Sequence, residues 1–129
     1  MMSSGRVWIL AGGIFGFLGV VAGALGVHAL RDTLESGPLS TFETGVRFQM
    51  YHAIVLLAVG LLAGRWKTGL VTLAGVLFAA GIVIFSGSLY ILAITGIGVF
   101  GAVAPLGGLS LIAGWASLIF GAIRQKDAA

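Results

Sequence analysis

The sequence predicts an all-α membrane protein, a single domain in which four transmembrane helices form a bundle, and two observations predict it. Of the 129 residues, 59% are hydrophobic and only 9% are charged, whereas about a quarter of the residues of a soluble domain are charged. Apolar runs of roughly 20 residues, which are long enough to cross a hydrocarbon core of about 30 Å, recur along the chain. The same composition excludes a disordered tail.

The first two spans follow from the positions of the charged residues. Residues 7–29 form an apolar run without a charge, and residues 41–63 form a second run that ends before Arg65 and Lys67. Each run has the length that a single helical crossing requires. We therefore expect the first two helices at these positions.

The start of the second helix carries a recognisable capping pattern. Ser40 and Glu43 have the spacing of a capping box and follow Gly37-Pro38, so we expect Ser40 to cap the helix. Glu43 and Arg47 are four residues apart and are expected to face each other at the level of the lipid headgroups. A solvated helix start, with no special role for this pair, is the alternative.

The last two spans come from one uncharged stretch. No charged residue occurs from Thr68 to Ile123, and this stretch is too long for one crossing at about 1.5 Å per residue. Three glycines within residues 95–101 mark the reversal, and Pro105 is then expected in the first turn of the last helix, where proline is tolerated. The predicted spans are residues 70–94 and 102–123.

An even number of crossings places both termini and the connection after the second span on one side of the membrane. The basic residues are concentrated there: that side collects Arg6, Arg65, Lys67, Arg124 and Lys126. The other side holds Arg31 and, at most, Arg47. Basic residues favour the cytoplasmic side. The sequence thus predicts a multi-pass protein of the plasma membrane, the bacterial inner membrane, with cytoplasmic N and C termini.

Small residues are spaced so that helices can approach closely. In lipid, helices associate through such residues because lipid tails are as apolar as leucine. The intervals in the first helix alternate between four and three residues, which keeps one seam along it: Gly12, Gly16, Gly19, Gly23 and Gly26. The last helix repeats the pattern with Gly114 and Gly121. We expect a compact bundle. There are more rows of small residues than one bundle needs, so a homo-oligomer or a complex with a partner membrane protein is also expected.

Six polar side chains in or near the spans are the candidate ligand-binding residues. The predicted topology places them all in the outer leaflet: His28, Gln49, His52, Ser86, Ser88 and Tyr90. His28 lies on the face opposite the glycine seam, so it joins the others only if Gly26 bends the helix or if the seam serves another neighbour.

Each of these residues also has a purely structural interpretation. Ser86 and Ser88 can bond to a carbonyl one turn earlier, and Tyr90 can anchor the interface. Gln49 can join two helices. His52 is the strongest functional candidate, because an ionisable ring inside a membrane is costly, although neighbouring hydroxyls and the amide could satisfy it as a neutral ring.

Several chemistries are disfavoured by the sequence. The net charge of +3 suggests nucleic-acid binding, but the basic residues stand at the ends of apolar runs, so we expect no nucleic-acid partner. There is no cysteine, no catalytic motif and no carboxylate within a span, and the two histidines have no haem or zinc spacing. We expect no enzyme, no catalytic residue, no cofactor and no metal site.

Four motifs now resemble a known family. They are Gly26-Val27-His28-Ala29-Leu30, Phe48-Gln49-Met50-Tyr51-His52, Phe85-Ser86-Gly87-Ser88-Leu89-Tyr90, and Pro105-Leu106-Gly107-Gly108 with Gly114-Trp115. In this order they are similar to the small inner-membrane proteins called domain of unknown function 423. Val27 and Phe48 depart from the usual alanine and tyrosine. The resemblance implies a four-helix plasma-membrane protein without an established activity, and it marks the histidines and the serine-tyrosine segment as motif positions.

Three functions are consistent with these observations. The first is a non-enzymatic accessory or scaffold protein whose outer-leaflet polar pocket binds a membrane lipid, a quinone-like molecule or a partner helix. The second is a small channel or transporter in which His52 lines a half-pathway. Thr72 is the only polar residue in the cytoplasmic halves of the second and third helices, which favours binding over permeation. The third is a haem- or metal-binding redox protein.

Overall fold

The computed structural model describes residues 4–67 and 69–125, and within them it contains four long helices. Two of these helices include a wider, π-helical turn, so their segments are labelled separately in chain order: α1 (Ser4–Leu25) with η1 (Gly26–Leu30), α2 (Ser36–Ala63), α3 (Gly69–Gly81) with η2 (Ile82–Ser86) and α4 (Gly87–Thr95), and α5 (Val99–Arg124). All four are long and apolar enough to cross a membrane. The predicted fold class is confirmed.

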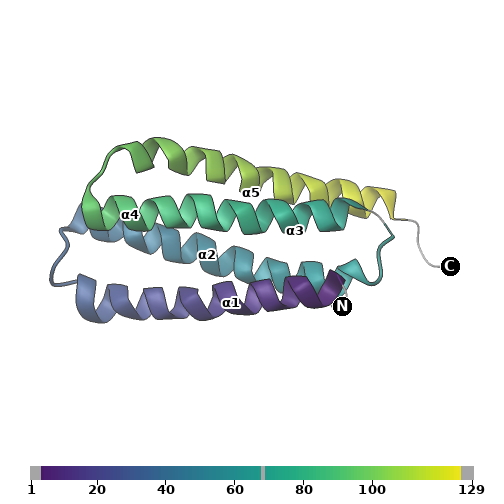
Figure 1. The fold of residues 1–129 in the computed structure, drawn as a ribbon, viewed down its shortest axis with the longest axis horizontal. Coiled ribbons are helices and arrows are strands. Elements are labelled where there is room, and N and C mark those ends of the chain that lie inside the picture. The colour runs from purple at the N-terminus through teal and green to yellow at the C-terminus, as the bar shows by residue number, and fades with distance from the viewer. Residues whose placement is uncertain (1–3, 68, 126–129) are drawn as a thin grey trace.

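The helices run alternately up and down (Figure 1). The first described residues, the end of α5 and the connection after α2 lie at one end of the molecule, and the two other connections lie at the opposite end. The second helix begins at Ser36, five residues before the predicted start at 41. The remaining boundaries differ from the predicted ones by at most three residues.

The expected cap of α2 is wrong. Glu35 occupies the N-cap position with extended backbone angles, and Gly37-Pro38 lies within the first turn. Proline fits there because the amide that it lacks would have no acceptor within the helix. The carbonyl of Ser40, meanwhile, accepts a bond from Thr44 Oγ1 at 3.0 Å. The favourable position of Pro38 therefore starts the helix one turn earlier than the capping-box pattern indicates.

Two further expectations near the helix starts also fail. Arg47 donates from Nη2 to Thr44 Oγ1 at 3.1 Å, and no ion pair joins it to Glu43 among the described side chains. Pro105 is the seventh residue of α5, not part of its first turn, because α5 already begins at Val99. The reversal before it depends on Gly96, whose φ of 71° is favourable only for glycine.

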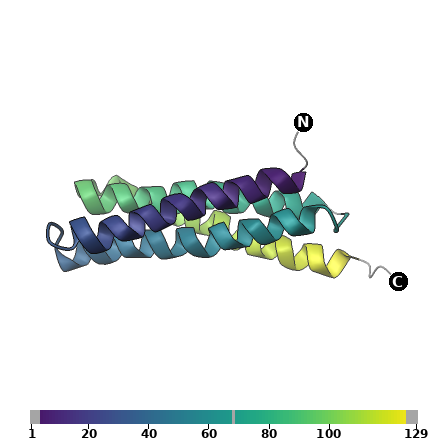
Figure 2. The same cartoon turned by 90° about the horizontal axis from the view of Figure 1, so that it is seen from below.

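The helices pack in chain order and do not form a closed ring. Figure 1 shows α1 and α5 on opposite sides, with α2 and the α3–α4 helix between them, and in the view from below in Figure 2 α1 lies in front. In the part of the chain that the structure describes, α1 packs mainly on α2 and makes only a small contact with α3, where Trp8 lies on Gly75. The Cα atoms of α2 and α5 do not approach within 8 Å. The predicted bundle is therefore an open row of helices that pack in chain order.

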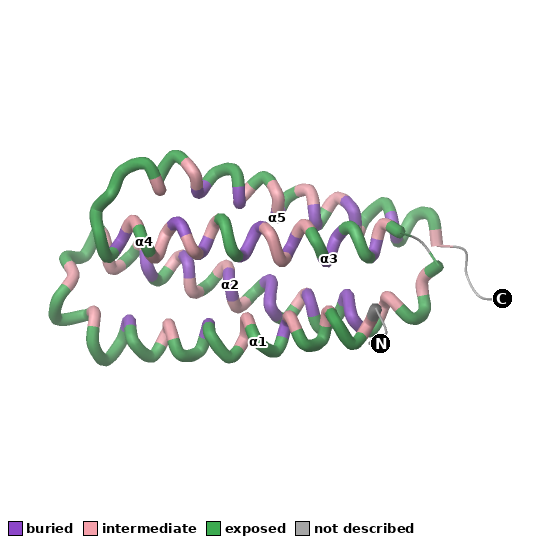
Figure 3. The backbone as a smooth tube through the Cα atoms, in the orientation of Figure 1, coloured by how far each residue is buried: buried purple, intermediate pink, exposed green. Residues whose placement is uncertain are grey.

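The buried core lies between α2, α3 and α5. Figure 3 shows buried positions along the facing sides of these helices, whereas α1 is mostly exposed. The core residues share full or nearly full burial: Leu56, Val59, Val71, Ala74, Phe78, Ile82 and Leu111. The outward side chains of α1, such as Phe17 with 69% of its surface exposed, point to the region that lipid occupies in a membrane. The whole molecule is thus one membrane domain, and only one side of its first helix packs on the other helices.

The glycine seam of α1 faces α2. A Cβ atom at Gly12 would lie 2.7 Å from the backbone oxygen of Ala53, and one at Gly19 would collide with the side chain of Met50. At Gly23 and Gly26 the nearest atoms of α2 side chains would be 3.4 Å away, and at Gly16 the distance would be 3.9 Å. Backbone atoms of α2 therefore come closest to the seam at Gly12, whereas the nearest α2 atoms opposite Gly19, Gly23 and Gly26 belong to side chains. In α5, Gly114 lies against the Phe78 ring, and Gly121 is buried.

Candidate functional site

Gln49 connects three helices near the middle of the molecule. Its side chain is buried on α2, its Nε2 donates to the carbonyl of Phe15 on α1 at 2.8 Å, and its Oε1 accepts from Tyr90 Oη at 2.6 Å. A Cβ atom at Gly19 would lie 3.5 Å from Gln49 Cγ, so the missing side chain there lets the amide approach the backbone of α1. Gln49 is thus an interhelical bridge.

Ser86 and Tyr90 attach the third helix to the same part of α2. Ser86 Oγ donates to the carbonyl of Gly45 at 2.7 Å, although the sequence suggested a bond within its own helix. The Tyr90 ring lies on Gly45, where a Cβ atom would be only 2.8 Å from its Cε1 atom, and it packs on Phe42 with centroids 4.9 Å apart. The absence of a side chain at Gly45 therefore permits both contacts.

His52 is buried one turn further along α2, and its partners define its protonation. Nδ1 lies 2.7 Å from the carbonyl of Phe48, which can only accept, so Nδ1 carries the proton. Nε2 accepts from the indole Nε1 of Trp115 on α5 at 3.0 Å, so it carries none. This assignment, made from the partners, gives a neutral imidazole with both nitrogens bonded.

A groove opens beside this pair, because α2 and α5 are joined here by side chains and not by their backbones. The groove has a volume of about 440 Å³ and is lined by Phe48, Tyr51, His52, Gly108, Ile112 and Trp115, together with the core residue Leu111. Tyr51 is 54% exposed and Trp115 is 44% exposed, whereas His52 is buried. The groove therefore leads from the lipid-facing surface to the imidazole. Of the six candidate ligand-binding residues, His52 lines this groove.

The structure separates the predicted residues into groups. Gln49, Ser86 and Tyr90 form one network, and His52 lies close to it but bonds to Trp115. His28 is exposed in η1, and Ser88 is buried without a hydrogen bond from its hydroxyl to another described residue. Phe42, against which Gly26 packs, is about 15 Å along α2 from His52, so the two histidines do not share a site.

Two contributors were missed by sequence reasoning. Trp115 was noticed only as part of a motif, although Gly108, Ile112 and Trp115 are spaced so that they share one face of α5. Ser110 was not predicted to connect helices, but its Oγ donates to the carbonyl of Leu77 at 2.7 Å and joins α5 to α3. A search for polar or aromatic residues at helical spacing within the last span would have found both.

Few side chains of this protein are placed to bind a metal ion. Among residues 4–67 and 69–125 there is no group of three or more His, Asp or Glu side chains that could hold a metal ion. The nitrogen of His52 that faces the groove is already bonded to Trp115.

Four apolar helices with buried interhelical hydrogen bonds define a multi-pass membrane protein. Residues 22–108 match the model of the family described as "Protein of unknown function (DUF423)", and the chain belongs to this family. The UPF0382 membrane protein YwdK of Bacillus subtilis is 43% identical over 120 residues, which cover 92% of this chain and 98% of the relative. The UPF0382 inner membrane protein YgdD of Escherichia coli K12 is 36% identical over 121 residues, or 94% of this chain and 92% of the relative.

No solved structure matches the chain. The names of the relatives and the four helices agree on an integral protein of the inner membrane. The resemblance found from the motifs is therefore confirmed, and so is the predicted localisation.

Proposed function

We propose that this protein is a non-enzymatic membrane protein that binds an apolar molecule with a hydroxyl group, such as a quinol, in the groove between α2 and α5. One observation carries the proposal: the hydrogen bond from Trp115 to His52 lies at the wall of a groove that is open to the lipid. Membrane-soluble ligands can reach such a groove without passing through water.

The two polar groups of the groove select the ligand. The indole N–H of Trp115 can only donate, and in the neutral tautomer Nε2 of His52 can only accept. A hydroxyl group inserted between them accepts from one and donates to the other, so both remain paired. A ketone oxygen can take the indole proton but leaves Nε2 without a donor, which is costly in an apolar surrounding. The pair therefore favours a quinol over the corresponding quinone.

The remaining walls suit an aromatic ring with an apolar tail. Phe48 and Trp115 present aromatic faces, and Ile112 presents an aliphatic side chain. A Cβ atom at Gly108 would have no neighbour closer than 3.7 Å, so this glycine contributes space to the groove. Most of the wall is apolar with few polar groups, as in ordinary small-molecule sites.

The other two functions have less support. A transport pathway needs polar groups that a permeant can use, whereas the side chains of Gln49, Ser86 and Tyr90 are bonded to one another or to the backbone. A haem or metal would require His52 to give up the indole, with no second histidine beside it.

The test is a titration of the purified protein in detergent with a short-chain ubiquinol, kept reduced, and with the matching ubiquinone. We expect saturable binding of the quinol, weakened about tenfold by Trp115→Phe, which keeps an aromatic ring but removes one donor. His52→Ala should lose binding, whereas His28→Ala, a histidine change outside the groove, should leave it unchanged. Equal affinity of the wild type and Trp115→Phe, or absence of binding by the wild type, would overturn the proposal.

A further inference from the structure

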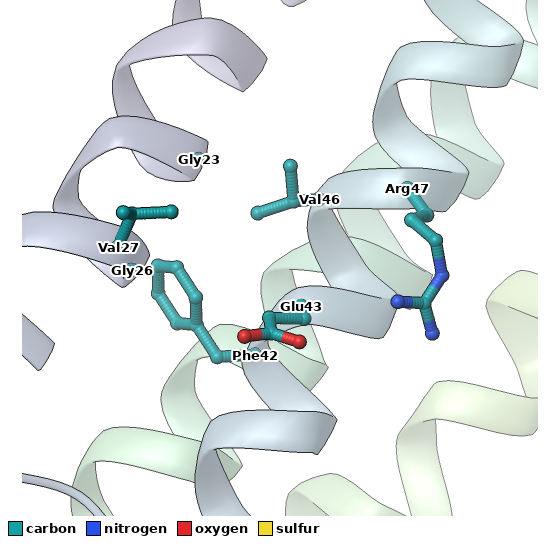
Figure 4. A pocket seen from close by; sticks show the side chains of 7 residues that line it. All are labelled: Gly23, Gly26, Val27, Phe42, Glu43, Val46 and Arg47. Carbon is teal, nitrogen blue, oxygen red and sulfur yellow. The ribbon is translucent and has the colours of Figure 1, made fainter. Parts of the chain in front are cut away.

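A second groove lies at the other side of α2, where the glycine seam opens. Figure 4 shows it between Gly23, Gly26 and Val27 of the first helix and the residues of α2 that face them. Its volume is about 220 Å³, and Phe42 and Val46 form the apolar wall on α2. Gly23 and Gly26 stand opposite these two side chains, so Val27 is the side chain of the first helix that lines the space.

Two charged residues of α2 border this apolar space. Glu43 and Arg47 both line it, both are exposed, and they do not pair with each other. Arg47 has one donor bonded to Thr44, which leaves the other N–H groups of its guanidinium available. The groove thus has one acidic and one basic side chain at its border, beside the apolar wall of Phe42 and Val46.

The depth of these charges matches the headgroup level of a bilayer. Glu43 is separated from Ala63, the last residue of α2, by about 30 Å of helix, which is the thickness of the hydrocarbon core. With the end of α2 at one boundary of the hydrocarbon, Glu43 lies at the other. Arg47 is one turn deeper, and its long side chain can extend back to the same level.

We propose that this groove binds a phospholipid of the phosphatidylethanolamine type. The phosphate accepts hydrogen bonds from Arg47, the primary ammonium donates to Glu43, and the start of an acyl chain lies on Phe42, Val46 and the two glycines. A choline headgroup carries the same charge but has no N–H to donate. The headgroup of phosphatidylglycerol has no ammonium group that could pair with Glu43, and its net negative charge is repelled by the carboxylate of Glu43.

The experiment is native mass spectrometry of the detergent-purified full chain titrated with dioleoyl phosphatidylethanolamine, phosphatidylcholine or phosphatidylglycerol. For the wild type we expect the ethanolamine lipid to bind about tenfold more tightly than the other two, because only it makes both charge-assisted contacts. Glu43→Gln should remove this preference, and Arg47→Gln should weaken all three lipids. Gly23→Leu should also weaken all three, because it fills the apolar space.

Two matched controls make the result specific. Glu35→Gln and Arg31→Gln change the same charges at the same end of the molecule but outside the groove, and both should keep the wild-type preference. A wild type without preference for the ethanolamine lipid would overturn the proposal. A preference that survives Glu43→Gln would do the same. Unchanged SDS-induced unfolding of Glu43→Gln and Arg47→Gln serves as the folding control, so this inference does not depend on the groove between α2 and α5.

Discussion

At the level of single residues, the polar side chains of this protein mainly connect helices. Gln49 bonds to α1 and α4, Ser86 bonds to α2, and Ser110 bonds to α3. Water cannot satisfy these groups within a bilayer, so a polar side chain that loses its partner there is costly. The hydrogen bond between Gln49 and Tyr90 is the clearest case, because it is short and joins the side chains of two different helices.

We predict that Gln49→Leu lowers the free energy of unfolding by about 1–2 kcal/mol, because two interhelical bonds are lost and the Tyr90 hydroxyl loses its acceptor. Tyr90→Phe removes one bond and should cost about 0.5–1 kcal/mol. The measurement is SDS-induced unfolding in mixed micelles. The double variant should cost less than the sum of the two single variants; full additivity would show that the bond does not contribute to stability.

At the level of secondary-structure elements, α5 packs unusually closely on η2. A Cβ atom at Gly107 would collide with the backbone nitrogen of Phe85 and would lie 2.8 Å from its Cα atom. A Cβ atom at Gly81 would collide with the side chain of Leu111 in the same interface. Backbone atoms cannot rotate away as a side chain can, so the contact at Gly107 requires glycine.

The neighbouring glycines of α5 provide a matched test of this packing. Gly107→Ala should lower the free energy of unfolding by about 1–3 kcal/mol, because α5 must move away from η2. Gly108→Ala should be neutral or slightly stabilising, because its nearest neighbour would be at 3.7 Å and alanine favours the helix. The same SDS titration compares them. If the two variants were equally stable, the close approach of α5 and η2 would not be a determinant of stability.

At the level of the whole molecule, the two ends differ in charge. The end with the termini carries Arg6, Arg65, Lys67 and Arg124, and the opposite end carries Arg31 and the acidic residues of the first connection. We propose on this basis that the N and C termini are cytoplasmic, because basic residues are retained on that side during insertion.

Labelling of single cysteines tests this orientation, since the natural chain has no cysteine. Gly64→Cys and Gly98→Cys place thiols in opposite end regions, at positions where a Cβ atom meets nothing within 4 Å. A membrane-impermeant maleimide should label position 98 in intact cells and position 64 only after lysis. The reverse pattern would contradict the proposed orientation, and labelling of both positions in intact cells would contradict a crossing of the membrane by the helix between them.

The sequence predicted the number of spans and placed most helix ends within three residues of those observed. For Gln49, a candidate ligand-binding residue, it gave a connection between two helices as the structural alternative, and the bond to Phe15 shows that connection. It also indicated that His28 would join the other polar residues only if Gly26 bent the helix or if the glycine seam served another neighbour. It could not identify Trp115 as the partner of His52. These residues belong to different helices, and they meet only when the two helices have one particular relative position along the bundle and one rotation about their axes. The capping-box pattern misled because Pro38 made an earlier start favourable.

The amino-acid sequence by itself determined that this chain dissolves in a bilayer, crosses it four times and places glycine along one side of α1. These properties depend on composition, on length relative to the bilayer and on the helical period, all of which are local. Only the tertiary structure decided that α2 and α5 stand apart and that His52 closes the gap through Trp115. It also decided that the seam of α1 opens beside Glu43 and Arg47. These features depend on how far neighbouring backbones approach each other, and contacts between distant residues set that distance.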